Sequence, residues 1–159
     1  MAKKFKTVRI TPTSLNATSG AVDEVIFNPT EIKNAVAHNG GAALLKSITV
    51  VDYDDNSNMA LDLYFFQLGT NDLGTLGDVI DITDAELLAN KSLGRVQMAA
   101  VANGAVGDMI LSRIYTQTGV DLLVQAEDAS SSIFVGAVCQ ASMVSTTSGT
   151  ELILGFEQL

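Results

Sequence analysis

Two apolar segments on either side of a polar cluster constrain this chain more than any other feature. Residues 42–68 read AALLKSITVVDYDDNSNMALDLYFFQL, and the cluster Asp54-Asp55-Asn56-Ser57-Asn58 lies between the two segments. β-Branched and aromatic residues around an Asp- and Asn-rich turn predict a long β-hairpin. The second segment alternates, with Met59, Leu61, Leu63 and Phe65 on one face and Ala60, Asp62, Tyr64 and Phe66 on the other. Because both faces are largely apolar, we expect these strands near the middle of a two-layer β structure.

Short apolar segments separated by turn residues fill most of the remaining chain. They predict further strands at residues 5–11, 21–27, 93–101, 108–116, 121–126, 133–144 and 151–158. The last two of these segments form a second predicted hairpin. Many short strands at even spacing are typical of an all-β sandwich or barrel. We therefore predict an all-β, antiparallel β-sandwich with a jelly-roll-like topology.

One short helix and one ambiguous segment complete this prediction. Thr83-Asp84-Ala85-Glu86 fits a capping box, so we predict a helix at residues 84–90. Residues 28–31, Asn-Pro-Thr-Glu, also fit a helix start. Residues 31–36 fit a short strand as well, and we favour the strand because it is what the family resemblance given below implies. The predicted division is an extended N-terminal arm with the first strand at residues 1–12, followed by a single sandwich domain at residues 13–159.

The charges are few and unevenly distributed. Charged residues make up 17% of the chain and the formal net charge is −9. Nucleic acid is therefore not expected as a partner, because phosphate binding needs clustered Lys and Arg. A soluble chain with so few charges often hides part of its surface in a partner or an oligomer.

A basic start precedes an acidic body. Lys3, Lys4, Lys6 and Arg9 lie at the N-terminal end, and no Lys or Arg occurs between Lys46 and Lys91. The stretch between those two lysines carries only acidic charges, at Asp52, Asp54, Asp55, Asp62, Asp72, Asp78, Asp81, Asp84 and Glu86. The basic arm is thus expected to dock on this body or on the acidic surface of a neighbour.

Neither a membrane nor a secretion pathway is expected. No apolar run approaches the roughly 18–20 residues that a membrane-spanning helix needs. The start MAKKFKTVRI has basic residues without an apolar segment after them, so it does not fit a signal peptide, and synthesis in the cytoplasm is the default. Cys139 is the only cysteine, which excludes an intrachain disulfide, and its apolar neighbours predict a small buried residue.

Residues for catalysis are sparse. His38 is the only histidine, and it lies in a Gly-rich turn. A hydrolytic triad needs such a base beside a nucleophile, and no G-x-S-x-G motif or nucleotide-binding glycine loop occurs. We predict no enzyme activity, no catalytic residue and no cofactor.

One acidic segment partly fits a calcium loop. Asp52, Asp54, Asn56 and Asn58 alternate as ligands do in an EF-hand, but Ser57 occupies the position of the required Gly. The position of the bidentate Glu holds a leucine. Asp and Asn also favour turns by bonding their own backbone. We interpret these residues as a turn and predict no metal site.

Three segments share a pattern with a known family. They are EIKNAVAHNGGAALLKSITVVDYDDNSNMALDLYFFQ at 31–67, ITDAELLANKSLGRVQM at 82–98 and FVGAVCQASMVSTTSGTELILGFEQL at 134–159. In this order they resemble small structural proteins of tailed bacteriophages. The shared pattern is an "NAV"-like strand end, a Gly-Gly turn, an "L-x-S-I/V-x-V-x-D" strand, a "D-L-x-F-F" strand, a short acidic segment and a final hairpin. The resemblance spans most of the chain and includes no catalytic residues.

This resemblance implies a non-enzymatic β-sandwich protein of the virion. The implied role is a decoration or cement protein on the capsid surface, which binds the major capsid protein and stabilises the head. Self-association is also implied, with a trimer favoured. The predicted partner-binding residues are those of the basic arm: Lys3, Lys4, Phe5, Lys6 and Arg9.

The alternative is a receptor- or glycan-binding β-sandwich module of a head fibre or tail. Such modules usually stack sugars on exposed aromatic side chains. The chain has no Trp, and its Phe residues lie in strand patterns that a core can bury. Tyr53 and Tyr115 are the remaining candidates for such stacking.

Overall fold

The structure, a computed structural model, describes residues 4–14, 20–54, 60–98, 113–142 and 149–159. The elements in this part of the chain are β1 (Lys4–Ile10), β2 (Val25–Ile32), β3 (Ala42–Asp52), β4 (Leu61–Phe66), α1 (Asp84–Asn90), β5 (Ser92–Met98), β6 (Arg113–Gln125), β7 (Ile133–Cys139) and β8 (Thr150–Gln158). The predicted β-sandwich with one short helix at 84–90 is confirmed.

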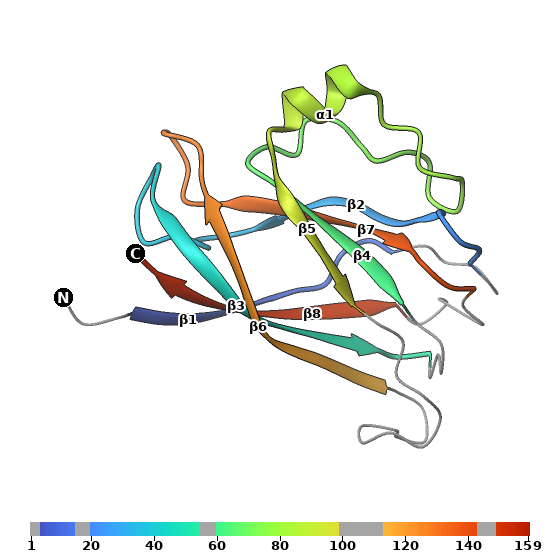
Figure 1. Cartoon of the computed structure of the whole chain (residues 1–159), viewed down its shortest axis with the longest axis horizontal. Coiled ribbons are helices and arrows are strands. Elements are labelled where there is room, and N and C mark those ends of the chain that lie inside the picture. The colour runs from blue at the N-terminus through green and yellow to red at the C-terminus, as the bar shows by residue number, and fades with distance from the viewer. Residues whose placement is uncertain (1–3, 15–19, 55–59, 99–112, 143–148) are drawn as a thin grey trace.

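The strands form two four-stranded sheets packed face to face (Figure 1). Sheet I has the order β1-β8-β3-β6, and sheet II has the order β2-β7-β4-β5. The strands pair antiparallel as β1 with β8, β2 with β7, β3 with β6 and β4 with β5. This is a ribbon of four strand pairs rolled into a sandwich, which is the jelly-roll arrangement.

Both faces of β4 are buried, by different partners, whereas β3 buries only one face and leaves the other partly exposed. Leu63 and Phe65 of β4 point between the sheets, where they join the inward side chains of β3, β7 and β8 in the main core. Phe66 points to the other face of sheet II and forms a second cluster with Val25, Leu73 and Val138. Leu73 comes from the segment between β4 and α1. This segment therefore covers the outer face of sheet II.

The predicted hairpin at residues 42–68 is wrong, because its two strands lie in different sheets. β3 pairs with β6 and β8 in sheet I, whereas β4 pairs with β5 and β7 in sheet II. Two aspartates at the end of β3 do bond to backbone: Asp52 Oδ1 accepts the Asp54 N–H at 3.1 Å, and Asp54 Oδ2 accepts the Gly149 N–H at 3.2 Å. A turn signal shows that the chain reverses, but it does not decide which sheet the returning strand joins.

The predicted hairpin of the last two strands is wrong for the same reason. β7 lies in sheet II between β2 and β4, and β8 lies in sheet I between β1 and β3. The two segments predicted at 108–116 and 121–126 correspond, within the described residues, to one long strand, β6. Its irregular middle has Gly119 and Asp121 at positive φ and a register shift opposite Leu45 and Ser47.

Residues 28–31 do not begin a helix. β2 continues through Asn28 and Pro29 to Ile32, and a turn follows, so the strand that we favoured ends earlier than predicted. The Asn28 side chain has another role. Its amide donates to the Gly74 carbonyl at 2.9 Å and accepts the Leu73 N–H at 2.8 Å. Asn28 thus holds the segment that covers sheet II.

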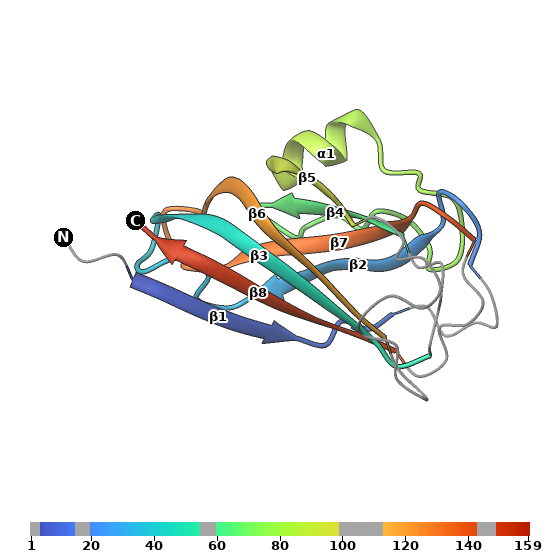
Figure 2. The same ribbon diagram turned by 60° about the horizontal axis from the view of Figure 1, so that its bottom comes forward.

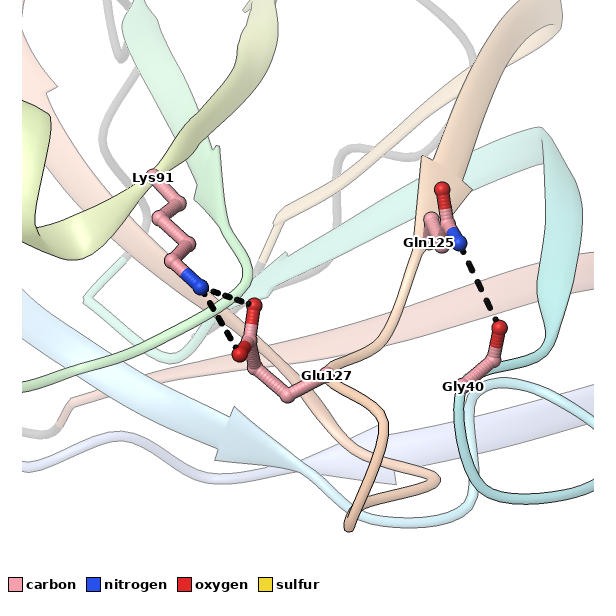
Figure 3. Close-up of polar contacts among 4 residues, drawn as sticks. All are labelled: Gly40, Lys91, Gln125 and Glu127. Atoms are coloured by element: carbon pink, nitrogen blue, oxygen red, sulfur yellow. Dashed lines mark hydrogen bonds and ion pairs between the residues drawn. The ribbon is translucent and has the colours of Figure 1, made fainter.

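The capping box of α1 is confirmed. The Glu86 N–H donates to Thr83 Oγ1 at 3.3 Å, and the Thr83 N–H donates to Glu86 Oε2 at 2.8 Å. At the other end, Lys91 adopts φ 54° and caps the helix. Lys91 Nζ lies 2.8 Å from each carboxylate oxygen of Glu127, and Figure 3 shows this ion pair near the contact of Gln125 with the Gly40 carbonyl.

No helix in the described part of the chain is long and apolar enough to cross a membrane.

The sheet assignment of β3 can be tested with a cysteine pair. Thr49 and Thr116 are register partners, and their hydroxyl oxygens lie 3.0 Å apart. We expect Thr49→Cys with Thr116→Cys to form an intrachain disulfide on mild oxidation, because directly opposed Cβ atoms come within reach of a disulfide. Mass spectrometry of the oxidised monomer detects it. In the control pair, Thr7→Cys with Thr116→Cys, the two cysteines lie on opposite edges of sheet I and should form no intrachain disulfide. Absence of the disulfide between positions 49 and 116 in a folded chain would contradict this register.

The capping box predicts a stability that depends on pH. The hydrogen bonds from Thr83 lower the pKa of Glu86, so this contribution is present at neutral pH and is lost as the pH falls through that lowered pKa. We expect Thr83→Ala to reduce the free energy of unfolding by about 1 kcal/mol at neutral pH. Under acidic conditions the loss should be smaller. Urea denaturation measures the loss in free energy of unfolding at each pH, with Thr13→Ala as a control. An equal loss at neutral and acidic pH would refute the coupling between Thr83 and Glu86.

Candidate functional site

The predicted partner-binding residues lie on β1, at one edge of sheet I (Figure 2). Lys3 is outside the described residues. β1 pairs with β8 from Lys4 opposite Gln158 to Ile10 opposite Leu152. The arm is therefore docked on its own chain as a strand. Docking on the chain's own body was one of the two possibilities that we expected. The edge of β1 that faces away from β8 has no partner strand among the described residues. The backbone N–H and C=O groups on that edge can therefore pair with an added strand.

The side chains of β1 alternate between two environments. Phe5 and Arg9 point to the outer face of sheet I, and Phe5 is 69% exposed. Lys6 and Ile10 point to the opposite side, where Ile10 enters the core. Phe5 is thus an exposed phenylalanine on a strand that a buried isoleucine anchors to the core.

A hollow of about 350 Å³ adjoins the start of β1. Lys4, Phe5 and Lys6 line one side of it, and the other side is lined by Asn34, Val36, Ala37 and Gln158. The Gln158 side-chain amide donates to the carbonyls of Asn34 at 3.4 Å and Ala35 at 3.3 Å, which ties the turn after β2 to the end of β8. The hollow therefore has walls from three separate parts of the chain. We call Lys4, Phe5, Lys6 and this hollow the β1 site.

Arg9 has a different role from the lysines. Its Nη1 lies 2.7 Å from Glu151 Oε2, and the Tyr53 hydroxyl donates to the same oxygen at 3.1 Å. This hydrogen bond raises the pKa of Tyr53, because deprotonation would place two negative oxygens together. Glu151 is only 7% exposed. Arg9 thus anchors β1 to β8. Lys4 and Lys6 form no ion pair with any residue that the structure describes.

The β1 site suits recognition of a protein surface. It combines two positive charges, one exposed aromatic ring and a strand edge that no described strand pairs with, which together fit an acidic surface with an extended segment. No group of three or more His, Cys, Asp or Glu residues that could hold a metal occurs in the described ranges. Asn56 and Asn58 of the calcium-like segment lie outside those ranges.

The two residues considered for catalysis lie in unrelated places. His38 is exposed in the turn after β2, with Nδ1 3.0 Å from the Asn39 carbonyl oxygen. Cys139 at the end of β7 is fully buried, as predicted, and its Sγ donates to the Ala141 carbonyl at 2.6 Å. Burial raises the pKa of this thiol, which keeps it protonated and weakly nucleophilic.

Two surface features could not be predicted from the sequence. Asp72, Asp81 and Glu86 of the acidic stretch gather around a hollow of about 610 Å³ beside α1. A more apolar hollow of about 550 Å³ lies next to Leu87 and Leu88 on the helix itself. The first hollow combines residues near Asn28, Asn71 and Asp81 that only the tertiary fold brings together, and the second joins α1 to Gln67. The tertiary fold likewise brings together Asn34 and Gln158 in the β1 site.

Comparison with known proteins adds little. No protein-family model and no curated protein matches the chain. Among solved structures, the chain is similar to one from "The Structure of Tomato Aspermy Virus by X-Ray Crystallography", with a TM-score of 0.43 and 11% identity over 98% of this chain and 76% of that chain. A second, from "Structure of infectious bursal disease virus Gx strain", has a TM-score of 0.28 and 9% identity over 99% of this chain and 37% of that chain. At these values neither likeness identifies a family or a function.

The docking of β1 predicts different outcomes for truncation and for charge removal. Deleting residues 1–9 removes most of the ladder with β8 and should clearly lower the urea midpoint or prevent folding. Lys4→Gln with Lys6→Gln should change the free energy of unfolding by less than about 0.5 kcal/mol, because both side chains lie at the surface. Urea denaturation compares the two proteins. A truncated chain as stable as the full chain would show that β1 contributes nothing to the fold.

Proposed function

We propose that this chain is a non-enzymatic structural protein of a virion, and specifically a decoration or cement protein that binds the major capsid protein on the outside of a phage head. The observation that supports this role most directly is the β1 site, a charged and aromatic strand edge held on a rigid sandwich. The resemblance to small phage structural proteins supports it independently of that site. The jelly-roll fold is compatible with the role but does not imply it, because unrelated functions share this fold.

Each part of the β1 site contributes to binding in its own way. Lys4 and Lys6 attract an acidic capsid surface and raise the association rate. Phe5 fills an apolar depression on the partner and slows dissociation, as aromatic anchors do at protein interfaces. The free edge of β1 accepts an extended capsid segment as an added strand. The three contributions fix both the position and the direction of docking.

Binding of this kind stabilises a shell without any chemical step. A protein that binds the assembled lattice and not the separate subunits shifts the equilibrium toward the lattice. A copy that contacts two capsid subunits bridges them, so each occupied position opposes expansion of the head. Many copies act together, and a modest affinity at each position is sufficient.

Imaging of the particle is the first test of this role. We expect a reconstruction of the virion that encodes this chain to show density for the sandwich on the head surface. Head and tail fractions of disrupted virions, compared by mass spectrometry, should contain the chain with heads. Recovery with tails alone would reject the proposal. Saturable binding to host surface polysaccharide in place of capsids would favour the receptor-binding alternative.

The role of the β1 site is testable by binding. We expect Lys4→Gln with Lys6→Gln to reduce co-sedimentation with capsids that lack the chain, and to do so most strongly at low salt, where charge attraction is least screened. Phe5→Ala should reduce binding at all salt concentrations. The control Lys46→Gln with Lys91→Gln removes the same charge from lysines that are already paired. Equal binding by all three variants would place the capsid contact elsewhere on the chain.

A further inference from the structure

The two outer faces of the sandwich differ sharply. The outer face of sheet II is covered by the segment between β4 and α1, whose Leu73 packs on Phe66. No described helix or strand lies over the outer face of sheet I, which Figure 2 shows toward the viewer. We propose that the outer face of sheet I is the contact surface for a second copy of this chain, packed sheet against sheet. This inference concerns another partner than the capsid role, although Phe5 and Arg9 of β1 lie at the edge of the same face.

The side chains on this face form rows across the sheet, and those without charge are small or apolar. One row runs across all four strands as Arg9, Ile153, Thr49 and Thr116. A second row runs from Phe5 through Glu157 and Leu44 to Leu123 on β6, which is 57% exposed. Thr49 and Thr116 satisfy each other's hydroxyl groups at 3.0 Å. A level surface of this kind allows a second sheet to approach to about 10 Å, the usual spacing of packed sheets.

The alternation along β3 shows that this face is continuous. Buried and partly exposed residues alternate along the strand. The alternation is interrupted once, at Lys46 and Ser47, which are both partly exposed. The register shift at this position explains the interruption, because a bulge places two successive side chains on one side. Opposite Ser47 on β8 is Gly155, where a Cβ would collide with the Ser47 hydroxyl. Gly155 and Ser47 therefore form a low point of the face, next to the side chain of Lys46.

Charge identifies the occupant as a second copy. The chain has a net charge of −9, so two copies repel each other over most of their surfaces. On this face the charges occur as opposite pairs, Arg9 with Glu151 and Lys46 with Asp121. Glu157 is only 5% exposed. Two copies can meet here without opposing like charges, whereas a strongly basic partner would be drawn to the acidic hollow beside α1.

The face is large enough for a stable contact. Four strands about 4.8 Å apart and about 30 Å long give a footprint of roughly 570 Å² on each copy. Two copies would bury roughly 1,100 Å² or more, which reaches the size of specific interfaces. Because the same face is used by both copies, the contact is isologous and two-fold. It is distinct from the trimer that the phage resemblance implies, which would need two different surfaces on each copy.

Sedimentation equilibrium of the full chain over a concentration series tests the proposal. We expect a species of twice the 16.7 kDa chain mass to form at high concentration. Leu123→Arg and Thr116→Arg should each weaken self-association about tenfold or more, because two copies would then bury unpaired like charges. Both positions are exposed, so the monomer should remain folded by circular dichroism.

A matched control uses the same substitution on the opposite side of the molecule. Leu88 of α1 is 78% exposed, and Leu88→Arg should leave the dimer intact. A wild-type chain that is monomeric at all concentrations would overturn the proposal. So would dissociation by Leu88→Arg with no effect of Leu123→Arg, which would place the contact on the helix. Sedimentation equilibrium uses the purified chain without capsids. Its result therefore tests self-association independently of the proposed binding to capsids.

Discussion

The pairing of strands that lie far apart in the sequence is the constraint on which the rest of the structure depends. β3 has β6 on one side and β8 on the other, and β8 in turn has β1 on its far side. Leu45, Ile48 and Val50 reach the core only because both neighbours of β3 are present. The long crossovers between sheets follow from this arrangement. Local interactions such as the capping box then stabilise segments whose positions the strand pairing has already determined.

The sequence was sufficient to predict the elements but not their partners. Alternation of apolar residues identified most of the strands, and the Thr83–Glu86 capping box identified the helix, because both signals are local. The two hairpins failed because a strand that is apolar on both faces is compatible with either sheet. The partner of Asn28 was not predictable either. Its side chain bonds to the backbone of Leu73 and Gly74 and not to the first turn of a helix. No local pattern encodes that partner.

The candidate site was predictable to a similar extent. The unequal charge distribution indicated Lys4, Lys6 and Arg9 as a group, but the structure separates Arg9, which is paired with Glu151, from the two lysines. The hollow next to Phe5 depends on Gln158 and residues 34–37, which approach β1 only through the tertiary fold. The covering of sheet II likewise leaves sheet I as the uncovered side. Function in this molecule is therefore a property of assembled edges and faces more than of any short motif.

The central position of β8 also has a consequence for how the protein is made. β8 is the last strand of the chain, yet it separates β1 from β3 within sheet I. During translation β1 is made before residues 150–158, with which it pairs. Because these contacts join residues far apart in the sequence, closing the sheet carries a loop-closure entropy. Sheet I can therefore close only after residues 150–158 have left the ribosome, and until then the apolar inner face of β3 can contact other nascent chains.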